Sequence, residues 1–250
     1  MDEKEIVYGK NPVEGLLETN PKRVNKIYIA KNIKYDPKIK NIISLARQNR
    51  IAINDVPKDK LDKLADGVHQ GIAASVAPIK YTEFEDLLKK LKGRNDALVL
   101  ILDKVEDPHN LGAIIRTAAA AGADGIIIPK RRSCQITSTV EKSSAGTVEK
   151  IPIVQEINLS AVIETLKENN FWVYGAEASA KDYYFNQKYD SNSAIILGGE
   201  DQGISSLVKK NCDMLVKIPV AENINSLNVS NAASILVYEI VRQRILKTAD

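Results

Sequence analysis

The chain has 250 residues, of which 44% are hydrophobic and 27% are charged, and its formal net charge is +3. This composition is typical of a soluble globular protein and excludes a largely disordered chain, while the length accommodates two domains. No run approaches the roughly 20 apolar residues that a membrane-spanning helix needs, and the first residues, MDEKEIVYGK, contain no apolar signal core. We therefore expect a cytoplasmic protein without membrane association.

The cysteines and the basic residues say little about function by themselves. Cys134 and Cys212 are the two cysteines, and they form neither a CxxC pair nor a cluster with histidine. We expect ordinary reduced thiols and no metal site. Basic residues crowd the first forty positions and form the run Lys130, Arg131, Arg132. Such groups either neutralise phosphates or make a solvated face, and composition does not decide between these readings.

The N-terminal third alternates between strand and helix patterns. Residues 23–30 and 51–54 predict short strands, residues 38–48 and 58–65 carry apolar side chains at helical spacing, and residues 71–79 predict a further strand. Residues 78–96 are strongly charged and predict one exposed helix bounded by Gly93. We interpret residues 1–77 as a first domain and residues 78–96 as a linker.

From residue 97 the pattern restarts as a second domain, residues 97–250. Residues 97–103 form a continuous apolar run of strand length, residues 110–123 are helical, and residues 124–129 predict another buried strand. Further strands are predicted at 150–154, 171–177, 193–199 and 214–220, and a long helix at 228–247 that Asn228 or Ser230 can cap. This order predicts the α/β class with a parallel sheet.

Three segments place polar residues after predicted strands, where a parallel sheet presents its site. LDKVEDPHNLGAIIRTAAAAG carries Asn110 and Arg116 on a helix rich in small residues. IILGGEDQGIS surrounds Glu200 with glycines but matches neither a Walker loop nor a dinucleotide fingerprint. IPVAENINSLNVSNAAS brings Ser226 and Asn228 to the start of a helix. Taken singly, the glycines are explained by a tight turn and the last segment by N-capping.

In this order and spacing, the three segments resemble the signature motifs of the SpoU/TrmH (SPOUT) family of RNA 2'-O-ribose methyltransferases. The segments YGKNPVEGLLE and HQGIAA are similar to the accessory, ribosomal-protein-like RNA-binding domain of the RlmB subgroup, which methylates guanosine in 23S rRNA. SSAGTVEKIPI is similar to a further family segment, so that the resemblance covers nearly the whole chain. It implies a C-terminal SPOUT domain tied in a deep trefoil knot, which composition alone would not suggest.

The resemblance also implies a donor, a set of site residues and an assembly. The donor would be S-adenosyl-L-methionine, held by Gly198, Ile218 and Leu227, with Glu177, Leu197, Gly199 and Asn228 close by. The catalytic set would be Arg116, Asn110, Glu200, Ser226 and Asn228, without a metal. Because a guanidinium stays protonated, we expect Arg116 to stabilise negative charge rather than to act as a base.

The family resemblance further implies a homodimer with the active site at the subunit interface, where Arg116 approaches the partner's donor pocket. In the N-terminal domain, Asn11, Arg23 and His69 are the expected RNA contacts, although Gln70 and Gly71 beside His69 can simply shape a turn.

The sequence therefore predicts methyl transfer to a ribose 2'-hydroxyl in RNA, with a guanosine of 23S rRNA as the favoured target. Methylation of adenosine in rRNA, or of tRNA, is not excluded by the motifs. A non-catalytic RNA-binding or ribosome-assembly factor is disfavoured because binding alone has no use for the full polar set. A small-molecule α/β enzyme is disfavoured by the accessory domain.

Overall fold

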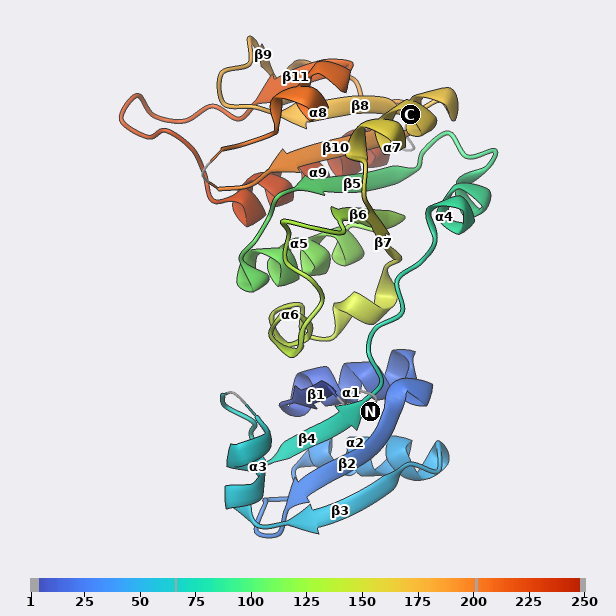
Figure 1. The fold of residues 1–250 in the computed structure, drawn as a ribbon, viewed down its shortest axis with the longest axis vertical. Helices are drawn as coiled ribbons and strands as arrows, with labels where there is room; N and C mark the ends of the chain where they lie inside the picture. The colour runs from blue at the N-terminus through green and yellow to red at the C-terminus, as the bar shows by residue number, and fades with distance from the viewer. Residues whose placement is uncertain (1–4, 66, 201, 248–250) are drawn as a thin grey trace. The chain divides into compact units, whose positions relative to one another are not determined.

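A computed structural model of the chain describes residues 5–65, 67–200 and 202–247. Contacts between residues divide the chain into two compact units, both drawn in Figure 1. The first unit contains the residues up to Lys80 together with residues 136–150, and the second contains residues 81–135 and the chain from Ile151 onward. Among the described helices, none combines the length and the apolar character that crossing a bilayer requires.

The first unit is built on a four-stranded mixed sheet with the strand order β1-β4-β2-β3. Strand β4 runs antiparallel to both β1 and β2, whereas β2 and β3 are parallel. The parallel pair is joined through helix α2, as a parallel connection requires. The elements are β1 (Glu5–Tyr8), α1 (Lys10–Thr19), η1 (Pro21–Arg23), β2 (Val24–Ala30), α2 (Pro37–Gln48), β3 (Ala52–Val56), α3 (Lys58–Leu64) and β4 (Ile72–Val76).

Apolar side chains on both faces of this sheet are buried. Successive strand residues point to opposite faces, so Ile27 and Ile29 join the cluster of α1 and α2, whereas Tyr28 packs in the cluster that contains Leu61 of α3. Helices therefore cover both faces. Strand β1 and helix α1 were not predicted from the sequence, because β1 has only four residues and α1 carries a proline and a glycine.

Residues 136–150 pack within the first unit, although the sequence places them between two strands of the second. They form α6 (Ser138–Ser143) and η2 (Thr147–Lys150). The buried Arg23 guanidinium binds Glu141 at 2.7 Å and also Glu149, and it lies 3.5 Å from Glu5. Burial raises the pKa of Glu141 to about 7, although the positive charge of Arg23 opposes this shift. The predicted domain 97–250 thus contributes a segment to the N-terminal unit, held by a buried ion-pair cluster.

The second unit is built on a seven-stranded sheet with the order β7-β6-β5-β10-β8-β11-β9, in which every neighbouring pair is parallel. The prediction of an α/β protein with a parallel C-terminal sheet is confirmed. The strands are β5 (Leu98–Asp103), β6 (Gly125–Pro129), β7 (Ile153–Glu156), β8 (Trp172–Ala176), β9 (Asp182–Tyr183), β10 (Ser193–Gly198) and β11 (Met214–Lys217).

Helices cover both faces of the parallel sheet. On one face, α4 (Phe84–Leu91), α7 (Leu159–Glu168) and α8 (Ser206–Asn211) share a core with β5, β6, β8 and β10. Helices α5 (Pro108–Ala120) and α9 (Val229–Lys247) pack against each other and against β6 and β10. The remaining element, η3 (Tyr184–Asn186), follows the edge strand β9.

Helix α4 differs from the exposed linker helix that the charges of residues 78–96 predicted. Phe84, Leu87 and Leu91 are 7%, 1% and 3% exposed and belong to the core of the second unit. Their spacing places them on one face of the helix, so that the charged residues occupy the other. The segment is therefore an amphipathic layer of the second unit rather than an exposed connection.

Replacing Arg23 by methionine removes the cation that binds Glu141 and Glu149, and we expect the free energy of unfolding to fall by about 3–5 kcal/mol. Urea denaturation of the purified variant measures this loss. The matched control is Lys22→Met, because Lys22 is the exposed neighbour in the same turn. Equal stability of the two variants would contradict a structural role for Arg23.

Candidate active site

The three motif segments converge at the carboxyl edge of the parallel sheet. Strand β5 lies inside the sheet, with β6 on one side and β10 on the other, so the chain order reverses there. In open α/β sheets, ligands bind at this kind of switch point, beyond the carboxyl ends of the strands. The first motif follows β5, the second follows β10 and the third follows β11. The topology alone therefore brings the three segments together.

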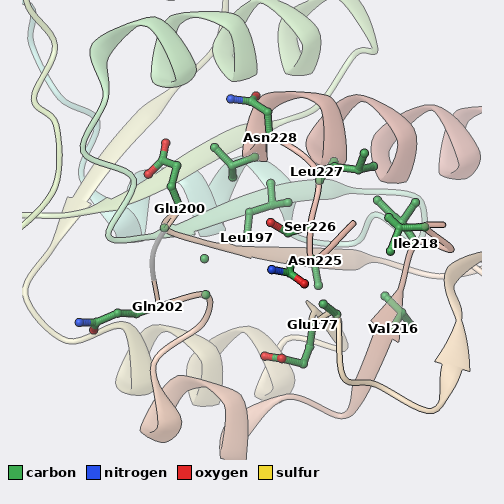
Figure 2. A pocket seen from close by; sticks show the side chains of 18 residues that line it. Glu177, Leu197, Glu200, Gln202, Val216, Ile218, Asn225, Ser226, Leu227 and Asn228 are labelled. Carbon is green, nitrogen blue, oxygen red and sulfur yellow. The ribbon is translucent and has the colours of Figure 1, made fainter. Parts of the chain in front are cut away.

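A cavity of about 440 Å³ opens at this edge and is shown in Figure 2. Glu177 lies across the cavity from Asn228, with Leu197, Ser226 and Leu227 between them. Every residue predicted to hold the donor lines this cavity, and so do Glu200 and Ser226 of the predicted catalytic set. The lining is Ala176, Glu177, Ala178, Leu197, Gly198, Gly199, Glu200, Gln202, Gly203, Val216, Ile218, Val220, Asn225, Ser226, Leu227, Asn228, Val229 and Ala232.

The buried side chain of Asn110 links the three motifs by hydrogen bonds. Its Nδ2 donates to Glu200 Oε1 at 2.5 Å, and its Oδ1 accepts from Asn228 Nδ2 at 3.0 Å. Asn228 Oδ1 in turn accepts from the backbone N–H of Ser230 at 2.9 Å, in the first turn of α9. Asn228 therefore performs the capping role that its position suggests and joins the polar network as well.

The second motif needs glycine because two segments of backbone cross there. A Cβ on Gly198 would lie 2.0 Å from the carbonyl carbon of Gly203, and one on Gly199 would lie 2.3 Å from the carbonyl oxygen of Lys104. The loop is fixed by hydrogen bonds from Gly203 N to Gly199 O at 3.0 Å and from Gly199 N to Asp103 O at 2.8 Å. Only glycine permits this approach, so the backbone itself forms one wall of the cavity.

Glu177 supplies a carboxylate at the far side of the cavity. Burial alone would raise its pKa, but hydrogen bonds from Lys209 and Ser179 outweigh burial and leave the pKa lowered. Lys209 Nζ lies 2.5 Å from Glu177 Oε2, and Ser179 Oγ donates to Oε1 at 3.0 Å. An ionised carboxylate accepts hydrogen bonds only, so this group suits the hydroxyls of a bound sugar.

Arg116 is the predicted catalytic residue that neither lines the cavity nor, among the described residues, forms a hydrogen bond with a residue that does, as Asn110 does. It lies on α5, its side chain is exposed, and within the described part of the chain no ion pair or hydrogen bond holds its guanidinium. The next residue, Thr117, contacts Ser234 of α9, with 3.2 Å between the hydroxyl oxygens. Arg116 is thus displayed on the surface of the α5–α9 pair.

The three predicted RNA contacts of the N-terminal unit occupy different environments. Arg23 is buried among carboxylates, which leaves its guanidinium no access to a phosphate, so we correct its role to a structural one. His69 is 6% exposed; its Nε2 lies 2.9 Å from Asp62, and its Nδ1 accepts from Gly71 N at 2.9 Å. This arrangement agrees with the alternative in which the residues around Gln70 and Gly71 shape a turn. Asn11 is exposed, and its Oδ1 accepts from Lys38.

Two features of the site were missed in the sequence. Asp103 ends β5 and is 4% exposed, and its Oδ2 accepts from the backbone N–H of Ser205 at 2.7 Å, which ties the second motif to the first. Its position as the last residue of the apolar run ALVLILD was the available signal. A second cavity, of about 330 Å³ and lined partly by Lys104 and Arg132, adjoins the first; nothing in the sequence pairs these two residues.

Both cysteines are free, and burial raises the pKa of each thiol to about 11. A thiol with so high a pKa is almost entirely protonated at neutral pH and is a poor nucleophile. Neither Cys134 nor Cys212 lines the cavity. The chemistry of the site therefore rests on its amide, carboxylate and backbone groups.

Comparisons with known proteins agree with the geometry of the site. The model of the SpoU rRNA methylase family matches residues 97–238, and the model of the RNA 2'-O ribose methyltransferase substrate-binding domain matches residues 6–82. TrmH family tRNA/rRNA methyltransferases of Staphylococcus aureus and Staphylococcus saprophyticus are 46% and 43% identical, each over 97% of both chains.

Solved structures share the fold over nearly the whole chain. The SpoU methyltransferase AviRb of Streptomyces viridochromogenes, in complex with AdoMet, aligns with a TM-score of 0.82 and 24% identity, covering 97% of this chain and 91% of that one. The TrmH/SpoU tRNA modifying enzyme of A. aeolicus aligns with a TM-score of 0.56 and 26% identity, covering 66% of this chain and 84% of that one.

The chain therefore belongs to the SpoU/TrmH family and carries the family's N-terminal substrate-binding domain. It is an RNA 2'-O-ribose methyltransferase that uses S-adenosylmethionine as the methyl donor. Family membership also implies a knotted C-terminal domain. Within the cavity, the apolar walls, the glycine backbone and the carboxylate of Glu177 fit a nucleoside-containing donor.

Gly198→Ala tests the backbone crossing, because its Cβ would lie 2.0 Å from the carbonyl carbon of Gly203. We expect S-adenosylmethionine binding to be lost and the free energy of unfolding to fall by roughly 3 kcal/mol, the upper part of the range for overpacking. Calorimetric titration and urea denaturation measure the two effects. Gly15→Ala is the control, since its Cβ would meet no atom closer than 3.5 Å. Unaltered donor binding by Gly198→Ala would contradict the role of this wall.

Proposed function

We propose that the enzyme methylates the 2'-hydroxyl of a guanosine in 23S rRNA, as members of the RlmB subgroup do. Support comes from the substrate-binding domain at residues 6–82, from the rRNA methylase family match, and from the three motifs in their order and spacing. The single observation that carries the methyl-transfer part of the proposal is the Asn110 network, which holds Glu200 and Asn228 beside the donor cavity. A protein that only binds RNA has no need of such an arrangement.

The donor supplies an electrophilic methyl group on a sulfonium, so the reaction is a direct displacement that needs no metal. In this displacement a carbon–oxygen bond would form at the ribose, the carbon–sulfur bond would break to leave a neutral thioether, and the proton of the hydroxyl would pass to water. The chain must place this oxygen in line and stabilise its developing negative charge. In this proposal, Asn110 and Glu200 orient the substrate, while Ser226 and Asn228 fix the loop and the ribose.

Arg116 is the proposed electrostatic partner of the reacting oxygen or of the adjacent phosphate. A guanidinium cannot accept the proton, because it stays protonated throughout the accessible pH range. Its planar fork instead donates hydrogen bonds to phosphate or to a nascent alkoxide. The exposed position of Arg116, outside its own cavity, supports a homodimer in which it reaches the cavity of the other subunit.

The surface around α9 suits such an assembly. Tyr238 and Leu246 are 49% and 53% exposed, and Leu227 at the mouth of the cavity is 37% exposed. Large apolar side chains exposed along one helix and at its start favour contact with a second protein surface. A two-fold arrangement would place two α5–α9 pairs and two cavities symmetrically, so each subunit would complete the site of the other.

Arg116→Ala should slow methyl transfer by roughly 10²–10⁴-fold, because electrostatic stabilisation of the transition state is lost. Single-turnover assays with saturating RNA measure the chemical step, and calorimetry should show nearly unchanged donor affinity. Arg116→Lys keeps the charge but loses the planar fork, so we expect an intermediate rate. A wild-type rate in Arg116→Ala would remove this residue from the mechanism.

Mixing two inactive variants tests whether Arg116 acts across the dimer. Arg116→Ala lacks the cation, whereas Leu227→Asp spoils the donor cavity. In a mixed dimer one of the two sites is intact, so random mixing should restore about a quarter of the wild-type activity. An active monomer in sedimentation experiments, or mixtures as inactive as their components, would exclude the shared site.

Mapping of 2'-O-methyl groups in rRNA from cells with and without this gene tests the proposed target. We expect one guanosine of 23S rRNA to lose its methyl group and to regain it when purified enzyme and S-adenosylmethionine are supplied. A missing methyl group on an adenosine or in tRNA would favour one of the alternative substrates. Unchanged rRNA and tRNA methylation would contradict the proposal altogether.

A further inference from the structure

A second cavity, of about 330 Å³, adjoins the donor cavity. Gly199, Glu200, Gln202 and Gly203 line both cavities, so the loop of the second motif separates two neighbouring spaces. The remaining lining of the second cavity is Lys104, Glu106 and Arg132, from the loops that follow β5 and β6. None of these three side chains lines the donor cavity.

The three charged side chains have no partner within the described part of the chain. No ion pair or side-chain hydrogen bond joins Lys104, Glu106 or Arg132 to another described residue. Glu200, by contrast, accepts a hydrogen bond from Asn110. Lys104 is half-buried and Glu106 and Arg132 are exposed, so all three charges are free to bind a ligand of matching charge and hydrogen-bond pattern that enters the cavity. That ligand must offer acceptors to the two cations and donors to the carboxylate.

The backbone holds the cations in an unusual conformation. Lys104 and Arg132 have φ values of 63° and 57°, in the left-handed region that side-chain-bearing residues rarely adopt. The two loops are joined by the hydrogen bond from Cys134 N to Val105 O at 2.9 Å. The Lys104 carbonyl also lies against Gly199, where a side chain would not fit, because a Cβ on Gly199 would be 2.3 Å from the Lys104 carbonyl oxygen. The surrounding fold therefore fixes the backbone of both residues beside the second motif.

A guanosine phosphate has the complementary pattern. Its phosphate oxygens accept from lysine and arginine, and arginine binds phosphate through two parallel hydrogen bonds. On the base, N1–H and the N2 amino group are two adjacent donors, which a single carboxylate accepts together. Adenine has an acceptor at N1 and lacks the amino group at C2, so it cannot satisfy a carboxylate in this way.

We propose that this second cavity binds the nucleotide that is methylated, with Lys104 and Arg132 on its phosphate and Glu106 on the Watson–Crick edge of guanine. This inference rests on the proposed function and deepens it by naming residues that select the base. Placed there, the ribose lies between the second cavity and the donor cavity, next to Glu200.

Binding of mononucleotides to the enzyme saturated with S-adenosylhomocysteine tests this assignment without RNA. Saturating the donor cavity prevents a nucleotide from entering it. The probes are guanosine, inosine and adenosine 5'-monophosphates, titrated by saturation-transfer NMR. Inosine lacks the N2 amino group and leaves one carboxylate oxygen unpaired. We expect the guanosine nucleotide to bind about 5- to 150-fold more tightly than the other two, the discrimination typical of a bidentate contact to a base.

Glu106→Gln should bring guanosine and inosine monophosphates to similar affinities, because the amide replaces one acceptor oxygen by an NH2 group, which cannot pair with the second donor of the base. Lys104→Ala and Arg132→Ala should weaken both nucleotides equally and leave their ratio unchanged. Arg131→Ala is the matched control, since Arg131 is exposed in the same loop but does not line the cavity. Unchanged S-adenosylhomocysteine affinity shows that each variant is folded.

The assignment is overturned if the wild-type enzyme does not distinguish guanosine from inosine monophosphate, if Glu106→Gln keeps the preference, or if Arg131→Ala weakens binding as much as Arg132→Ala does. These outcomes are independent of the rRNA mapping. If the mapping finds a methylated guanosine but the mononucleotides bind without preference, the guanine site in the second cavity is rejected and the proposed target stands. If the mapping finds a methylated adenosine but guanosine monophosphate still binds most tightly, the proposed target is rejected and the guanine-binding site stands.

Discussion

The site depends on one buried amide, that of Asn110. Its side chain is 8% exposed and bridges Glu200 of the second motif and Asn228 of the third. An amide is suited to this position because it both donates and accepts, so that it satisfies a carboxylate on one side and a second amide on the other. Leaving such a buried group unpaired would cost about 1–3 kcal/mol, so the bridge holds the three loops in one arrangement.

The parallel sheet makes this bridge possible. Strands β5 and β10 are neighbours with Leu102 opposite Leu197 and Asp103 opposite Gly198, so their carboxyl ends lie side by side. Asp103 then binds the second motif through both its backbone carbonyl and its carboxylate. The glycines of that motif let the backbone pass close enough to separate two cavities by a single loop. The donor and the proposed RNA nucleotide would thus occupy adjacent cavities on the two sides of this loop.

Much of the catalytic unit follows from the sequence because its strands are continuous apolar runs. The run 97–103 and the segments around Glu200 and Asn228 indicated both the sheet and the donor cavity. Contacts between distant segments could not be predicted in this way. No periodicity signals that Arg23 binds Glu141, which is 118 residues away, so Arg23 was expected at the RNA and lies instead in the core. The sequence likewise does not indicate that Lys104 and Arg132 line one cavity, because only the tertiary structure brings them together.

A crystal structure of the enzyme with S-adenosylhomocysteine would test the central claim most directly. We expect the nucleoside between Gly198 and Leu227, its ribose hydroxyls near Glu177, and its sulfur directed toward the side of the cavity where Asn110 holds Glu200 and Asn228. A ligand bound elsewhere, or one that enters this cavity only after the Asn110 bridge has broken, would contradict the account.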